Sequence, residues 1–193
     1  IPSQTLGGAR IVRGAGAGPY GAGALTGTIA LDERTTIPGG VAGEFAAGEL
    51  GYYGGSAAVD AAAGSTRLLF ALQGEHSDGW IPVEASRRGA ADSRLALDTL
   101  GGAFRTLSEL GSGVLALRAS AFTEKRQSGV FGAASKVKGT AYSATYAVAP
   151  AGAALGWRVQ AWLRTSDLAN TSAAVAADRN STNPANNQFA TPA

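Results

Sequence analysis

The chain has 193 residues, of which 45% are hydrophobic and only 16% are charged, against about 25% charged residues in a typical soluble domain. Its net charge of +2 comes from 16 basic and 14 acidic residues that are interspersed, unlike the concentrated positive charge of nucleic-acid-binding proteins. The lack of cysteine, and of any run of about 20 apolar residues, excludes a disulfide scaffold, a thiolate metal site and a helical membrane protein.

The N-terminal segment is rich in glycine and lies between two strand-like runs, residues 10–12 and 26–31. It contains a G-x-G-x-x-G pattern at Gly16, Gly18 and Gly21. A dinucleotide site of that pattern needs a helix that opens at the loop and leads to a parallel strand. Pro19 lies inside this loop, and too few residues follow it for a crossover helix. We therefore exclude dinucleotide binding.

Further along the chain, apolar and polar residues alternate with a period of two, which predicts half-buried strands. The clearest case is residues 155–164, where Trp157 and Val159 alternate with Arg158 and Gln160. The same alternation predicts strands over residues 67–76, 92–99, 114–124 and 140–148. The Asn-rich end, residues 179–193, is predicted to be a loop or a strand that enters one.

Short and long connections alternate between these strands. Residues 64–65, 109–113 and 149–152 predict tight turns, whereas residues 78–91 and 125–138 predict long loops. This alternation is typical of an up-and-down antiparallel meander in a transmembrane β-barrel. A soluble β-sandwich is the competing interpretation, but it should present more lysine on its wet face than the three that occur here, Lys125, Lys136 and Lys138.

The glycine-rich segment resembles the end of the plug domain of TonB-dependent outer-membrane receptors. That family has a strand of the type Arg-Ile-x-Val-x-Arg-Gly, then a Tyr-Gly-x-Gly-Ala loop, then a strand of the type x-Ile-x-Leu. The matching residues are 10–14, 20–27 and 28–31, although the first motif is one residue shorter here and Ala15 replaces a common proline. Residues 77–80, Ser-Asp-Gly-Trp, are similar to the end of an early barrel strand in these receptors.

The resemblance implies that residues 1–36 are the C-terminal part of a plug domain. Residues 37–193 would then be the N-terminal portion of a large plugged barrel, starting with a strand and its bend over residues 41–55. Such barrels have about 22 strands, and we expect about seven here. An open sheet in lipid leaves backbone groups unpaired, so the chain is expected to be a piece of a longer protein.

The same resemblance implies an active transporter in the bacterial outer membrane, which imports a siderophore-, cobalamin- or saccharide-like nutrient with energy from a TonB-type partner. The expected substrate contacts are in the plug loop and the outer loops, at Ala15, Gly16, Ala17, Gly18, Trp80, Arg87 and Arg88. Arg13 is expected to lock plug to barrel through glutamates of the wall. We expect lipid and a small nutrient as further partners, and no nucleic acid.

No reaction chemistry or cofactor is predicted. His76 is the single histidine, so no metal-ligand spacing exists, and a structural or exposed role is favoured. His76, Ser77 and Asp78 are adjacent along a strand, where neighbouring side chains point to opposite faces, so they are not a catalytic triad. Two other functions remain open: a passive β-barrel porin, and a soluble β-rich binding or structural module.

Overall fold

The computed structural model of the chain describes residues 2–13, 27–152 and 155–191. This described part is built of two antiparallel sheets and two short 3₁₀ turns. No helix in these ranges is long or apolar enough to cross a bilayer. The smaller sheet is a pair of strands, β1 (Leu6–Arg13) and β2 (Gly27–Glu33), preceded by η1 (Ser3–Thr5).

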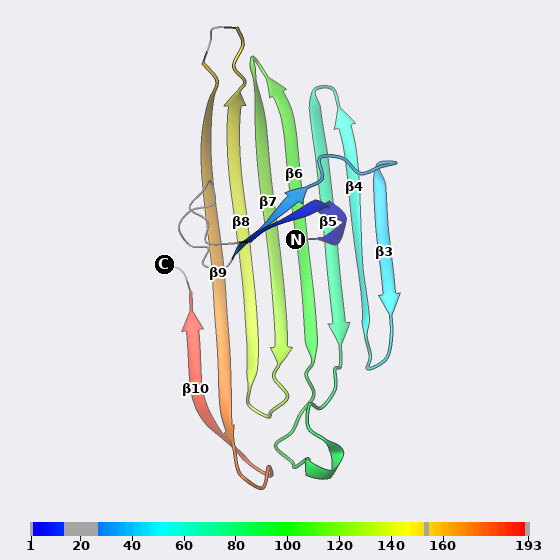
Figure 1. Cartoon of the computed structure of the whole chain (residues 1–193), viewed down its shortest axis with the longest axis vertical. Helices are drawn as coiled ribbons and strands as arrows, with labels where there is room; N and C mark the ends of the chain where they lie inside the picture. The colour runs from blue at the N-terminus through cyan, green and yellow to red at the C-terminus, as the bar shows by residue number, and fades with distance from the viewer. Residues whose placement is uncertain (1, 14–26, 153–154, 192–193) are drawn as a thin grey trace.

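The larger sheet has eight strands, each hydrogen-bonded to the next in the sequence (Figure 1). The strands are β3 (Val41–Ala47), β4 (Tyr53–Ala63), β5 (Thr66–Ser77), β6 (Leu97–Leu110), β7 (Gly113–Gln127), β8 (Ala134–Val148), β9 (Trp157–Val175) and β10 (Thr182–Ala190). A second 3₁₀ turn, η2 (Ala85–Arg87), lies between β5 and β6. The predicted all-β antiparallel meander is confirmed. Within the described residues the sheet is open, with β3 and β10 at its edges.

Successive connections lie at alternate ends of this sheet (Figure 1). The tight turns predicted within 64–65 and 109–113 are confirmed, but the connection predicted as a tight turn at 149–152 spans 149–156 and is longer than those over 48–52, 128–133 and 176–181. The ends are named here for the two tight turns at one of them and for the long β5–β6 connection at the other. The short-turn end carries the β4–β5, β6–β7 and β8–β9 connections. Gly64 and Gly111 open the first two of these turns with φ of +58° and +59°, the left-handed conformation that two-residue hairpins require. The long-loop end carries the β3–β4, β5–β6, β7–β8 and β9–β10 connections.

Three segments differ from the sequence-based prediction. Residues 93–96 were predicted as strand, but β6 begins at Leu97 because Ser93 donates its amide to the carbonyl of Gly129 in the β7–β8 connection and Leu95 donates to Trp80 within its own connection. Residues 125–138 were predicted as one loop, but only 128–133 lie outside β7 and β8. Finally, residues 41–55 are not one strand with a bend: β3 ends at Ala47 and a separate strand, β4, follows, so the sheet has eight strands instead of about seven.

The two faces of the large sheet differ in chemistry. One face, here called the inner face, carries polar and charged side chains such as Gln73, Arg105 and Arg118. The opposite face, here called the outward face, is mostly apolar from β3 to β9. Its large side chains include Val41, Val59, Phe70, Phe104, Leu117, Tyr142, Val159 and Leu163, which lie in neighbouring register positions and are all exposed.

The β1–β2 hairpin belongs to a separate sheet and crosses the large sheet at an angle (Figure 1). The segment that follows β2 returns to the inner face through Ile37, which is 3% exposed and packs with Ala58, Leu69 and Ala71. The Ile37 amide also donates to the Asp60 carboxylate at 3.0 Å. This small core fixes the point at which the hairpin joins the eight-stranded sheet, called the wall below.

Candidate functional site

The hairpin is fastened to the inner face by an ion-pair cluster centred on Glu33, at the end of β2. One oxygen of Glu33, Oε2, lies 3.2 Å from Nη1 of Arg105 and 3.2 Å from Nη1 of Arg118. Arg105 also donates from Nη2 to the carbonyl of Arg34 at 2.5 Å. We call Glu33, Arg105 and Arg118 the hairpin lock.

The sheet register explains why the lock needs a carboxylate. Arg105 of β6 and Arg118 of β7 are directly opposite each other, and like charges in that position destabilise a sheet. Arg105 is also nearly buried, with its side chain 9% exposed, and a buried charge needs a partner. Glu33 therefore supplies the negative charge that the neighbouring strands of the wall lack at this position.

A second contact fastens η1 to the first two strands of the wall. The Ser3 hydroxyl donates to Glu44 at 2.5 Å and lies 3.0 Å from the Ser56 hydroxyl, which itself donates to Glu44 at 2.8 Å. Glu44 and Ser56 are register partners on β3 and β4, so both side chains lie on the inner face. The hairpin unit is thus attached at its beginning and at its end.

A recess opens beside η1, toward the long-loop end. Its polar lining comes from Ser3 and from inner-face residues of four strands and of the β3–β4 turn, namely Glu44, Tyr52, Ser56, Gln73, Glu75 and Thr99. We call it the inner recess. It offers two carboxylates, an amide and hydroxyls, and no basic side chain among its lining residues. Such a set can hydrogen-bond a hydroxyl-rich ligand or hold a cationic group.

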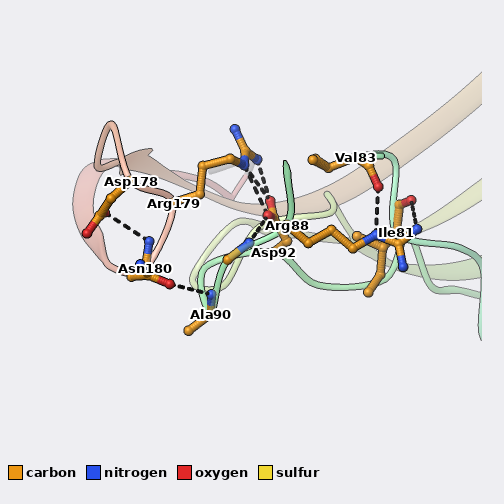
Figure 2. A network of polar contacts seen from close by, with 9 residues as sticks. Ile81, Val83, Arg88, Ala90, Asp92, Asp178, Arg179 and Asn180 are labelled. Carbon is orange, nitrogen blue, oxygen red and sulfur yellow. Dashed lines mark hydrogen bonds and ion pairs between the residues drawn. The ribbon is translucent and has the colours of Figure 1, made fainter. Parts of the chain in front are cut away.

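At the long-loop end, three connections are joined by hydrogen bonds. Asp92, in the β5–β6 connection, accepts from Nε of Arg179, in the β9–β10 connection, at 3.0 and 3.1 Å and also from its Nη2 (Figure 2). Ala91 donates its amide to the carbonyl of Arg179 and accepts from the amide of Phe131, in the β7–β8 connection, both at 2.9 Å. We call the Asp92–Arg179 pair the loop clamp.

The contacts of the loop clamp favour the ionised form of Asp92. Hydrogen bonds from the Arg179 guanidinium, and then from the Gly89 amide at 2.9 Å, lower the pKa of the Asp92 carboxyl from an ordinary 3.8 to about 2. Arg179 has a left-handed backbone, with φ of +58°, a conformation that non-glycine residues rarely adopt. The clamp holds this turn in place.

The predicted substrate residues do not form one site in the described structure. Ala15, Gly16, Ala17 and Gly18 lie outside the described residues. Trp80, Arg87 and Arg88 all lie in the β5–β6 connection, and Trp80 is 58% exposed. Arg88 folds back on its own loop, where its Nε donates to the carbonyl of Val83 at 2.6 Å (Figure 2). None of these three residues lines the inner recess.

Arg13, the predicted lock residue, ends β1 opposite Gly27 and is exposed. None of the ion pairs found in residues 2–13, 27–152 and 155–191 involves it, and its role stays a prediction. The lock that the structure contains has the reverse polarity, with the carboxylate on the hairpin and the arginines on the wall. Sequence reasoning missed it. The available signal was a pair of arginines, Arg105 and Arg118, on consecutive polar strand faces.

His76 has a structural environment on the outward face. Its Nδ1 lies 2.7 Å from Asp98 and its Nε2 lies 3.4 Å from Asp78, while the ring stacks on Tyr53 with centroids 4.8 Å apart. The Ser77 hydroxyl accepts from the amide of Gly79 at 3.1 Å. In the part of the chain that is described, no group of three or more potential ligands could hold a metal ion.

Comparison of the chain with protein families, with curated proteins and with solved structures finds no match. The functional argument therefore depends on the geometry described above. The antiparallel pairing of β1 with β2 argues against dinucleotide binding, because a dinucleotide-binding unit would need these strands to be parallel.

Proposed function

We propose that this chain is part of an active transporter of the bacterial outer membrane, of the TonB-dependent receptor type. The observation that carries the proposal is the pairing of a two-faced antiparallel meander with a separate hairpin locked onto its polar face. In this proposal the apolar outward face lies against lipid, the inner face lines the lumen, and the hairpin is the end of a plug.

The outward face supports a membrane position. A contiguous apolar face this large, left exposed on a soluble monomer, would be an aggregation hazard. Two aromatic side chains close it at the short-turn end: Tyr146 and Trp157, with ring centroids 5.3 Å apart. The Tyr146 hydroxyl donates to the carbonyl of Leu110 at 2.8 Å, so the ring has a polar and an apolar side. Aromatic residues of this kind form the girdles of transmembrane barrels.

The hairpin lock supports a plugged lumen over an open one. A passive porin needs a free passage along its polar face, whereas here η1 and the end of β2 are bonded to that face through Ser3 and Glu33. A transporter of this class must hold its plug while idle and rearrange it when energised. Polar contacts between separate sheets suit that cycle because ion pairs can be exchanged for water, and the apolar contact beside them, at Ile37, is small.

The cargo that fits this half of the lumen is a hydroxyl-rich or cationic solute, by the chemistry of the inner recess. Within the three nutrient classes expected from the resemblance, this favours a saccharide-like or polyhydroxylated ligand. No enzymatic step is proposed.

The test is uptake by cells that lack the gene and carry the full-length gene on a plasmid. Growth is measured with a ferric siderophore, cobalamin or a saccharide as the single limiting nutrient, with and without a protonophore that removes the energy source. We expect growth on one nutrient that requires both the gene and the energised inner membrane. Growth that survives the protonophore would indicate a porin, and a product that fractionates without detergent would indicate a soluble module.

A further inference from the structure

All three lysines of the chain lie on the outward face at the long-loop end. Lys125 is on β7, and Lys136 and Lys138 are on β8. Outward register positions of β7 run from Leu115, through Leu117 and Ala119, to Lys125. At about 3.4 Å per residue and a tilt of about 40°, this distance rises about 26 Å, close to the height of the apolar band of a membrane barrel. The lysines therefore lie at the level of lipid headgroups, given the membrane position proposed above.

Two of these lysines face each other, and the carboxylate opposite Lys125 on its other side, Asp98, contacts His76. Lys125 and Lys136 are direct register partners, an arrangement that destabilises a sheet when both are charged. The neighbouring carboxylates are engaged elsewhere: Asp167 with Lys138 at 2.9 Å, and Asp98 with His76 at 2.7 Å. Among the ion pairs of the described residues, none satisfies Lys125 or Lys136. An anion between their ammonium groups would relieve the repulsion.

A shallow recess begins beside Lys125 on the same face. Gly55 and Gly74 are opposite each other in the register and leave a floor without side chains. Around this floor stand Phe45, Tyr53, Leu100 and Thr123, with His76, Asp98 and Lys125 at the long-loop end. We call it the outer recess. It joins an apolar trough to a cation, which matches the shape of an amphiphile.

We propose that Lys125, Lys136 and the outer recess bind one anionic lipid. Its phosphate lies between the two ammonium groups, and an acyl chain lies in the trough over Gly55 and Gly74. The proposal rests on the membrane position of the proposed function, and it adds a specific lipid partner that transport itself does not require.

The experiment uses the full-length protein, inserted into vesicles of phosphatidylcholine with one-fifth phosphatidylglycerol and analysed by native mass spectrometry for retained lipid. We expect retention of phosphatidylglycerol in preference to phosphatidylcholine. A double variant, Lys125→Gln with Lys136→Gln, should lose about fivefold in that preference per lysine, since each basic side chain near an anionic surface contributes on that scale. The matched control is Arg126→Gln with Arg158→Gln, which removes equal charge from inner-face positions of β7 and β9.

A second variant tests the trough. A methyl group at Gly74 would be 3.6 Å from Leu100 Cδ1, which is ordinary contact, so Gly74→Ala fills the floor without a clash. It should reduce retention while leaving both lysines in place. Equal retention by the lysine variant and its control would overturn the proposal, as would complete displacement of the lipid by millimolar inorganic phosphate. Failure of every variant and the wild type to enter vesicles would instead overturn the proposed function, and this site with it.

Discussion

The hairpin lock and the loop clamp both pair arginine with a carboxylate, but they bury opposite partners. In the lock, the Arg105 side chain is 9% exposed and Glu33 is 33% exposed. In the clamp, the Asp92 side chain is 1% exposed and Arg179 is 32% exposed. A buried arginine cannot lose its charge, whereas a buried aspartate can take up a proton. In the lock the buried group therefore keeps its charge and needs the carboxylate as its partner, whereas in the clamp the buried group is itself the one that can be neutralised, so the clamp should fail in acid.

The largest effect is expected from Glu33→Gln, which leaves Arg105 buried without a counter-charge. We expect a loss of about 3 kcal/mol in the free energy of unfolding, at the lower end for broken buried pairs because Arg105 keeps the Arg34 carbonyl. Thermal unfolding of the full-length protein measures the loss, and proteolysis between residues 34 and 40 reports release of the hairpin. Glu49→Gln, in the exposed β3–β4 turn, is the control, and an unchanged midpoint would contradict the lock.

A smaller effect is expected from Gly89→Ala, beside the clamp. The added methyl would lie within the radius of the Arg179 carbonyl, with no flexible side chain there to move aside. Such overpacking costs about 1–3 kcal/mol. Hydrogen exchange should rise at Ala91 and Phe131, whose amides bond across loops, and leave β6 and β7 unchanged. Exchange that stays slow at both amides would show that the connections are not held together at this point.

The pH dependence tests the clamp directly. Because the folded pKa of Asp92 is about 2 against an ordinary 3.8, the clamp contributes fully above about pH 4 and is lost as the pH falls toward 2. Exchange at the Ala91 amide should accelerate over that interval beyond its intrinsic pH dependence. Asp92→Asn should give the loosened state already at pH 7 and remove the added dependence. If Asn leaves the exchange slow, the ionised pair is not what joins these loops.

The smallest effect is expected from Arg118→Gln, because Arg118 is the exposed member of the lock. Its side chain is 52% exposed, and exposed ion pairs contribute about 0–1 kcal/mol. Unfolding with increasing salt should weaken the Arg118 contribution and leave that of Arg105. A loss as large as that of Glu33→Gln would mean that the two arginines share the carboxylate equally.

The strands of the large sheet were predictable because one face is apolar and the other is polar. Apolar and polar residues therefore alternate with a period of two along residues 67–76, 114–124 and 140–148. The ends of strands were less predictable. Lys125, Lys136 and Lys138 indicated a loop, although they lie on the outward face near the ends of β7 and β8. Residues 93–96 alternate like a strand, but the Ser93 amide bonds to the β7–β8 connection and the Leu95 amide bonds to Trp80 within the β5–β6 connection.

The lock and clamp were beyond sequence reasoning for a different physical reason. Glu33 lies 72 residues from Arg105, and Asp92 lies 87 residues from Arg179. Which carboxylate meets which arginine depends on the register of several strands and on the path of two connections, and local pattern fixes neither. Glu33 shows this limit, because the sequence pointed to Arg13, whose role stays a prediction, and gave no sign that a glutamate on the hairpin would contact Arg105.

The unequal strand lengths have one further consequence for the long-loop end. In the register row through Lys125 and Lys136, β3 stops at Ala47, whereas β9 continues from Ala169 to Val175. Beside the longer strands lies the β5–β6 connection. Its residues 91–96 form backbone hydrogen bonds with the end of β7 and with the β7–β8 and β9–β10 connections. That stretch therefore extends the long-loop end of the sheet beside the longer strands. Inserted residues can be accommodated between 80 and 88, but within 89–96 they would break the hydrogen bonds that join these connections.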